Sequence, residues 1–247
     1  MKDYISSADL AIWIVLIAGK AALCAIIFKK QFFQRMRWFS TYVFVSTVRS
    51  LLLFAFTFWA SYATYYYFYY AAGYLISALA FFTLIEAGRR VLPGLNLPQK
   101  EKAGGLLLFA IGAIFTFAGF WPLRSIETRI ELGAQLTVAV AFIFIAAYSR
   151  YLGLYWSRLV AGISASLGLL YLVQGAVRVV TGHFPSELVL LVRQINEVAN
   201  VLAVIAWIVV VLSPWGEREM TEQDLKKIED AFARIEASIG VGGAEAR

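Results

Sequence analysis

The stretch SELVLLVRQINEVANVLAVIAWIVVVLS, residues 186–213, decides the fold of this chain. As an α-helix it would be about 42 Å long, at about 1.5 Å per residue, and a bilayer's hydrocarbon core is about 30 Å thick. Lipid offers no hydrogen-bond partners to an exposed backbone, so an apolar segment of this length must be helical to cross a membrane. The stretch therefore predicts a membrane-spanning helix.

Six further apolar runs resemble this one, at 8–28, 38–59, 66–88, 103–121, 128–149 and 156–179. Of the 247 residues 61% are hydrophobic and only 15% are charged, and the mean hydropathy is +0.72. A soluble domain would carry about a quarter charged residues. The predicted fold class is an all-α polytopic membrane protein, with a seven-transmembrane-helix bundle over residues 1–216.

Basic residues gather in alternate connections between these runs. The segments 29–37, 89–102 and 150–158 carry Lys and Arg, whereas 60–65, 122–127 and 180–185 carry little or no net charge. Loops rich in Lys and Arg stay on the cytoplasmic side of a membrane. We therefore expect the N-terminus outside and the C-terminus in the cytoplasm. The basic excess then has a topological origin, so it gives no reason to expect nucleic-acid binding.

Residues 217–247 form the predicted cytoplasmic tail, with an amphipathic helix at about 221–239. Its apolar positions alternate in spacing between three and four, as in a heptad repeat: Leu225, Ile228, Phe232, Ile235 and Ile239. The helix could pack on the protein's own basic loops, pair with a second copy, or dock on a cytoplasmic partner protein. The tail is acidic overall, which disfavours binding to an anionic membrane surface.

The inventory of reactive side chains is small. The chain has one Cys and one His, too few for an internal disulfide or for a zinc or iron site built on His and Cys. Every Asp lies at or beyond an end of the apolar region, at Asp3, Asp9, Asp224 and Asp230, and no phosphate-binding glycine loop is present in the sequence. We therefore expect a protein that is not an enzyme and that carries no metal or cofactor.

Ionisable residues within the apolar runs are costly, and they usually face the interior of a bundle. Lys20, Arg49 and Glu197 fall at about the same depth in the first, second and last runs. These three helices would be neighbours in a sequential ring, so we expect the three charges to cluster. Arg193 and Asn200 share a helix face with Glu197, at i−4 and i+3.

Other polar residues should point into the same space. They are Tyr74 in the third run, Glu131 and Gln135 in the fifth, and Gln174 and Arg178 in the sixth. Together they predict a polar chamber that opens to the outside. It could be an ion-pair network that only fixes helix register, or a site for a ligand, ion or proton. The excess of one cation favours an anionic ligand, a lipid headgroup or a water network.

Aromatic residues concentrate where the second run ends and the third begins: Trp59, Tyr62, Tyr65, Tyr66, Tyr67, Tyr69 and Tyr70. Tyr and Trp favour the membrane interface, because the ring is apolar and its polar tip stays hydrated. The cluster is therefore either an interfacial belt or an aromatic patch that binds a ligand.

The tracts FSTYVFVSTVRS (39–50) and YLISALAFFTLIEA (74–87) resemble uncharacterised bacterial seven-helix membrane proteins. The resemblance implies the seven-helix fold and the bacterial inner membrane, but no activity and no site residues. The topology is also that of rhodopsins and G-protein-coupled receptors. The last run, however, has no lysine to hold retinal, so we expect no retinal.

The leading functional interpretation is a receptor or sensor-like membrane protein. It would bind a small ligand or lipid in the outer chamber and signal through its cytoplasmic tail. The main alternative is a transporter, channel or accessory subunit that uses the midplane charges as an ion or substrate site. An intramembrane enzyme is a third interpretation, which the residue inventory disfavours.

Overall fold

A computed structural model describes residues 7–91, 126–151, 156–183 and 186–213, together with Lys226 and Asp230. Within these ranges the secondary structure consists of helices and short connections, without a strand. The elements are α1 (Ser7–Lys29), the short 3₁₀ helix η2 (Phe32–Gln34), α2 (Arg37–Trp59), α3 (Tyr62–Val91), α5 (Ile126–Tyr151), α6 (Arg158–His183) and α7 (Ser186–Leu212). The expected all-helical fold is confirmed for this part of the chain.

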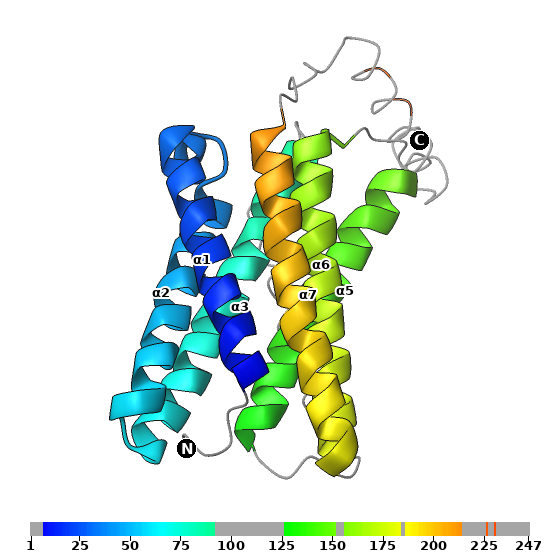
Figure 1. Cartoon of the computed structure of the whole chain (residues 1–247). Helices are drawn as coiled ribbons and strands as arrows, with labels where there is room; N and C mark the ends of the chain where they lie inside the picture. The colour runs from blue at the N-terminus through cyan, green and yellow to red at the C-terminus, as the bar shows by residue number, and fades with distance from the viewer. Residues whose placement is uncertain are drawn as a thin grey trace.

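The six α-helices that the structure describes form a closed ring (Figure 1). Going round it, α1 packs on α2, α2 on α3, α3 on α5, α5 on α6, α6 on α7, and α7 on α1. Helix α3 also contacts α6 across the ring. Helices α3 and α5 run in the same direction, so α3 ends and α5 begins at opposite ends of the bundle. The span expected at 103–121 lies between them in sequence, outside the described residues.

Within the described residues, five helices are long and apolar enough to cross a membrane: Leu10–Lys29, Arg37–Trp59, Tyr62–Arg90, Arg158–Val180 and Gln194–Leu212. Large apolar side chains face outward from these helices; Val15, Leu169 and Leu202 are all more than half exposed. Exposing this apolar surface to water would be unfavourable in free energy, whereas exposing it to lipid would not. The architecture is compatible with a multi-pass integral membrane protein.

The predicted tail falls almost entirely outside the described residues, and so do its five apolar positions, Leu225, Ile228, Phe232, Ile235 and Ile239. Lys226 and Asp230 are both helical and exposed.

Side chains tie the helices together at the end of the bundle where α1 ends. The Lys30 ammonium group donates to the carbonyl oxygens of Val211 and Leu212, at 3.0 and 3.1 Å, and so caps the C-terminus of α7. The Glu86 carboxylate on α3 accepts hydrogen bonds from the backbone N–H groups of Arg37 and Trp38, at 2.9 and 3.0 Å. These are the first two residues of α2, whose own N-cap residue offers no side-chain cap.

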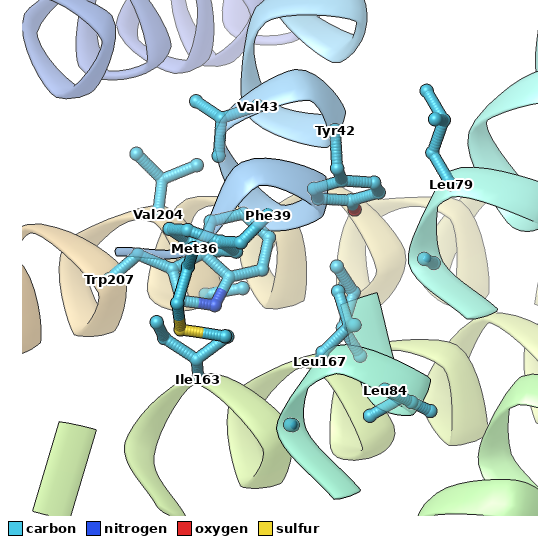
Figure 2. Close-up of a cluster of buried hydrophobic side chains, with 14 of the residues drawn as sticks. Met36, Phe39, Tyr42, Val43, Leu79, Leu84, Ile163, Leu167, Val204 and Trp207 are labelled. Atoms are coloured by element: carbon cyan, nitrogen blue, oxygen red, sulfur yellow. The ribbon is translucent and has the colours of Figure 1, made fainter. Parts of the chain in front are cut away.

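An apolar core fills the half of the bundle near these caps. Its most deeply buried large side chains, at most 1% exposed, include Met36, Phe39, Leu84, Ile163 and Leu167, most of them labelled in Figure 2. Trp207 packs edge-on against the rings of Phe39 and Tyr42, with centroids 5.8 and 5.7 Å apart. This half of the bundle is therefore packed with apolar side chains from α2, α3, α6 and α7.

Small residues on α6 permit close contacts with both neighbouring helices. A Cβ atom added at Gly162 would lie 2.5 Å from a methyl carbon of Val210 on α7, and one at Gly168 would lie 2.2 Å from ring atoms of Phe142 on α5. Glycine at these two positions therefore lets α6 pack closely against α7 and α5.

Candidate functional site

The other half of the bundle encloses a polar cavity of about 580 Å³. All six described α-helices line it, and each does so mainly through the part nearer the end where α1 begins. Five charged residues take part: Lys20, Arg49, Glu131, Arg178 and Glu197. The described lining therefore has three cationic and two anionic groups, which is a formal excess of one positive charge.

Lys20 on α1 is buried, and its ammonium group donates to two hydroxyl groups on α2. The distances are 2.8 Å to the Ser46 Oγ and 2.9 Å to the Ser50 Oγ. Ser46 and Ser50 are one helical turn apart, so both point at the same atom of α1. Ser50 in turn donates to the Ser46 carbonyl oxygen at 2.9 Å. The ammonium group thus sits among neutral oxygen atoms.

Arg49 on α2 lies against Tyr69 on α3. Its guanidinium carbon is 5.0 Å from the centre of the Tyr69 ring, and its Nη2 donates to the Tyr69 carbonyl oxygen across a long 3.4 Å. The Arg49 Nε is buried and has no hydrogen-bond partner among the described residues. A cation over an aromatic ring is stabilised by the ring's electron density, so Tyr69 helps to hold this charge inside the bundle.

Arg178 on α6 approaches the same tyrosine. Its guanidinium carbon lies 5.6 Å from the centre of the Tyr69 ring, and its Nη2 donates to the Tyr69 hydroxyl group. That nitrogen is also 2.9 Å from each carboxylate oxygen of Glu131 on α5. The Arg178 side chain is 25% exposed and that of Glu131 is 5% exposed. This ion pair joins α5 to α6 at the wall of the cavity.

Amide side chains complete the wall between α6 and α7. The Gln174 amide nitrogen is 3.5 Å from the Asn200 Oδ1, and Asn200 donates to the carbonyl oxygen of Asn196 at 2.7 Å. On α5, Gln135 donates to Glu131 across 3.4 Å. The Gln135 Oε1 is buried without a partner among the described residues. The long distances leave these amide groups able to bond to a ligand.

Tyrosine and serine hydroxyl groups form the deep end of the cavity. Tyr42, Ser77 and Tyr171 are buried there, and the Tyr171 hydroxyl group donates to the Ile76 carbonyl oxygen at 3.3 Å. Tyr42 also contacts Trp207 of the apolar core (Figure 2). In the described part of the chain, polar lining therefore gives way to apolar packing near the middle of the bundle.

The structure brings most of the candidate site residues together. Lys20, Arg49, Gln174, Glu197 and Asn200 all line this one cavity. The expected neighbours of α1 are also present, since α1 packs on both α2 and α7. That these residues bind a ligand stays a prediction.

Two candidate residues differ from the other five. Tyr74 stacks near Tyr70, with ring centroids 6.4 Å apart, and is not part of the cavity lining. Arg193 belongs to α7, but its side chain lies outside what the structure describes.

On α3 the cavity lining does not include the expected Tyr74. Tyr65, Tyr69, Gly73 and Ser77 line the cavity at intervals of four, together with Ile76. Tyr65 and Tyr69 belong to the aromatic cluster, for which a membrane belt was one interpretation. The i+4 spacing from Ser77 back to Tyr65 was the signal that could have identified this face.

Comparison of the chain with models of protein families, with curated proteins and with solved structures finds no significant match. The functional argument therefore depends on the cavity itself.

Proposed function

We propose that this chain is an integral membrane receptor or sensor-like protein that binds a small ligand or lipid in the polar cavity. One observation carries the proposal: five charged residues from five helices surround a single cavity, in a bundle whose other half is packed with apolar side chains. Ionisable groups at membrane depth are retained mainly where they bind, conduct or signal. A volume of about 580 Å³ also falls in the range of known small-molecule sites.

The proposal includes an orientation and a route for the signal. The cavity faces the outside of a bacterial inner membrane, and the acidic tail, residues 217–247, lies in the cytoplasm. Helix α7 would connect the two, because Asn196, Glu197 and Asn200 line the cavity and the tail follows its last residue, Leu212. Ligand contacts on α7 could then bias its position and be sensed by a cytoplasmic partner or a second copy.

A cavity-filling variant tests whether ligands bind here. A Cβ at Gly73 would lie 3.6 Å from the Arg49 Nη2 and 3.7 Å from the Glu131 Oε1, so alanine fits but leucine would intrude on the cavity. The purified full chain is screened for small molecules that raise its melting temperature, since a ligand that binds only the folded state stabilises it. A hit should stabilise the wild type and Gly73→Ala but not Gly73→Leu. Hits that stabilise all three equally would refute a ligand site in this cavity.

The transporter alternative is favoured by the same intramembrane charges, and a flux assay separates it from a receptor. In proteoliposomes that contain a screened ligand, a receptor gives no flux, whereas a transporter gives flux that Glu197→Gln stops. Deleting residues 217–247 should leave ligand binding intact in both cases. It should abolish the response of the cell only for a receptor.

A further inference from the structure

Of the three cations in the described lining of the cavity, Arg178 forms an ion pair with a carboxylate, whereas the hydrogen bonds of Lys20 and Arg49 go to neutral oxygen atoms. Arg178 has the Glu131 carboxylate 2.9 Å away. Lys20 meets the hydroxyl groups of Ser46 and Ser50, and Arg49 meets the carbonyl oxygen and ring of Tyr69. Hydroxyl and carbonyl dipoles stabilise a buried cation less than a carboxylate does. Lys20 and Arg49 are therefore the cations to which a bound anion would add most.

The α1 side of the cavity has a different character. Ile12, Trp13 and Leu16 line it from α1, and they lie nearer the start of that helix than Lys20 does. Leu53 on α2 and Ile76 on α3 add further apolar surface. At about 1.5 Å per residue, Lys20 lies about 12 Å deeper along α1 than Ile12. The cavity thus combines a deep cationic region with an apolar wall leading to it.

We propose that the ligand is a monoanionic amphiphile, whose carboxylate or phosphodiester head binds Lys20 and Arg49 and whose apolar part lies along the α1 wall. The single excess positive charge of the lining residues that the structure describes matches one negative charge. Each methylene group of the ligand that is buried against the apolar wall would strengthen binding. This inference depends on the proposed function, because it specifies which ligands the cavity takes.

Three probes of equal chain length separate charge from hydrophobicity: decanoate, decanol and decylamine. Their binding is measured at equilibrium, with the full chain in phosphatidylcholine nanodiscs and with empty nanodiscs as the baseline. Decanoate should bind saturably, decanol at least tenfold more weakly, and decylamine not above the baseline. Binding of decanoate should be lost in Gly73→Leu, which places it in the cavity.

Charge-neutralising variants locate the head group. Arg49→Gln and Lys20→Met should each weaken decanoate binding at least tenfold. Arg89→Gln removes the same charge from an exposed residue in the last turn of α3, at the other end of the bundle, and should leave binding unchanged. Lys20→Met replaces a buried cation by an apolar chain of similar length, so it is expected to fold even if Arg49→Gln does not. The melting temperature of each variant checks that it is folded.

The source of the anionic head is distinguished by adding phosphatidylglycerol, a lipid with a monoanionic phosphodiester, to the nanodiscs. Competition with decanoate for the wild-type chain, beyond any change that phosphatidylglycerol causes with empty nanodiscs, would identify a membrane lipid as the ligand, and a lack of such competition would identify a free carboxylate. If decanoate, decanol and decylamine bind equally, and Gly73→Leu abolishes the binding of all three, the ligand need not be a monoanion. The proposal that the cavity binds ligands would then still hold. The proposed function is refuted as well if Gly73→Leu blocks the binding of none of the three probes and the melting-temperature screen also finds no ligand for the cavity.

Discussion

Tyr69 is the residue on which two partly buried cations converge. Arg49 and Arg178 come from helices on different sides of α3, and both guanidinium groups lie within about 6 Å of its ring. One tyrosine side chain thus interacts with two like charges. At the residue scale this arrangement explains how the cavity holds three cations with two carboxylates in the described lining.

Gly168 shows how little space separates α5 from α6. Replacing it by alanine would place a methyl group 2.2 Å from two ring atoms of Phe142 and 2.8 Å from the Phe142 Cβ, so the backbone must shift as well as the ring. Overpacking of this kind typically costs about 1–3 kcal/mol. We expect Gly168→Ala to lower the melting temperature of the detergent-purified chain by about 2–12 °C, at about 2–4 °C per kcal/mol.

Gly73→Ala is the matched control, because its added carbon would meet its nearest neighbour at an ordinary 3.6 Å. Alanine is also the better helix former, by about 1 kcal/mol. Gly73→Ala should therefore leave the melting temperature unchanged or raise it. Equal losses in the two variants would show that the close contact between α5 and α6 is not what matters at Gly168.

The sequence could predict those site residues that stand out within their own stretch of sequence, but not those whose role depends on how the helices pack. Lys20, Arg49 and Glu197 could be identified because a charge in an apolar run is conspicuous in the sequence alone. The pairing of Arg178 with Glu131 could not, since it depends on which helices become neighbours and how each is rotated. Tyr69 was masked by the surrounding tyrosines, whose abundance also suits a membrane interface.

At the scale of the elements, the ends of the helices follow the apolar runs closely. The run at 38–59 corresponds to α2, Arg37–Trp59, and the run at 186–213 to α7, Ser186–Leu212. The run at 66–88 underestimates α3, Tyr62–Val91, because the first turn of α3, Tyr-Ala-Thr-Tyr, contains three residues with hydroxyl groups, whose hydropathy is low. Helix order round the ring could be predicted only in outline, from short connections.

The Arg178–Glu131 ion pair is the charged link between α5 and α6 in the described residues. Removing one partner of a fully buried pair costs about 3–5 kcal/mol, because the other charge is left uncompensated. The Arg178 side chain is a quarter exposed, so we expect a smaller loss for Glu131→Gln, about 2 kcal/mol. The measurement is thermal unfolding followed by tryptophan fluorescence.

The double variant Glu131→Gln with Arg178→Gln provides the control, since it removes both charges. It should be more stable than the sum of the two single losses predicts. If the three variants show strictly additive losses, the two side chains do not interact, and the ion pair is not what joins these helices.

Glu86 makes the start of α2 depend on α3. Its carboxylate accepts the backbone hydrogen bonds of Arg37 and Trp38, which no side chain at the N-cap of α2 supplies. Loss of a helix cap costs about 1 kcal/mol. Glu86→Ala should therefore speed hydrogen exchange of the first amides of α2 severalfold. The control is Arg89→Ala, which changes an exposed residue three positions further along α3 and should leave this exchange unchanged. Unchanged exchange in Glu86→Ala would show that water caps this helix instead.

At the scale of the whole molecule, the bundle has two unlike halves. Polar groups concentrate toward the end where α1 begins, and apolar packing with helix caps from Lys30 and Glu86 occupies the other. A channel needs polar surface through its full length, so this conformation of the described residues fits a binding cavity better than a pore. A transporter would have to rearrange the apolar half to expose the cavity on the other side.

Reaction of single cysteines with a membrane-impermeant maleimide tests both the orientation and the one-sided access. The chain has a single cysteine, Cys24, so Cys24→Ala gives a cysteine-free background. Into it Thr57→Cys introduces a thiol on the cavity wall. Ser61→Cys and Gln34→Cys place thiols at exposed sites at the two ends of the bundle.

In intact spheroplasts we expect labelling of Ser61→Cys and Thr57→Cys but not of Gln34→Cys, which should react only after the membrane is opened. In inside-out vesicles Gln34→Cys should be labelled and Ser61→Cys should not. Thr57→Cys should also stay unlabelled in these vesicles, because the apolar half of the bundle blocks the reagent. Labelling of Thr57→Cys from both sides would mean that the cavity alternates its access. That outcome favours a transporter, whose cycle must expose the same charged residues to each side in turn.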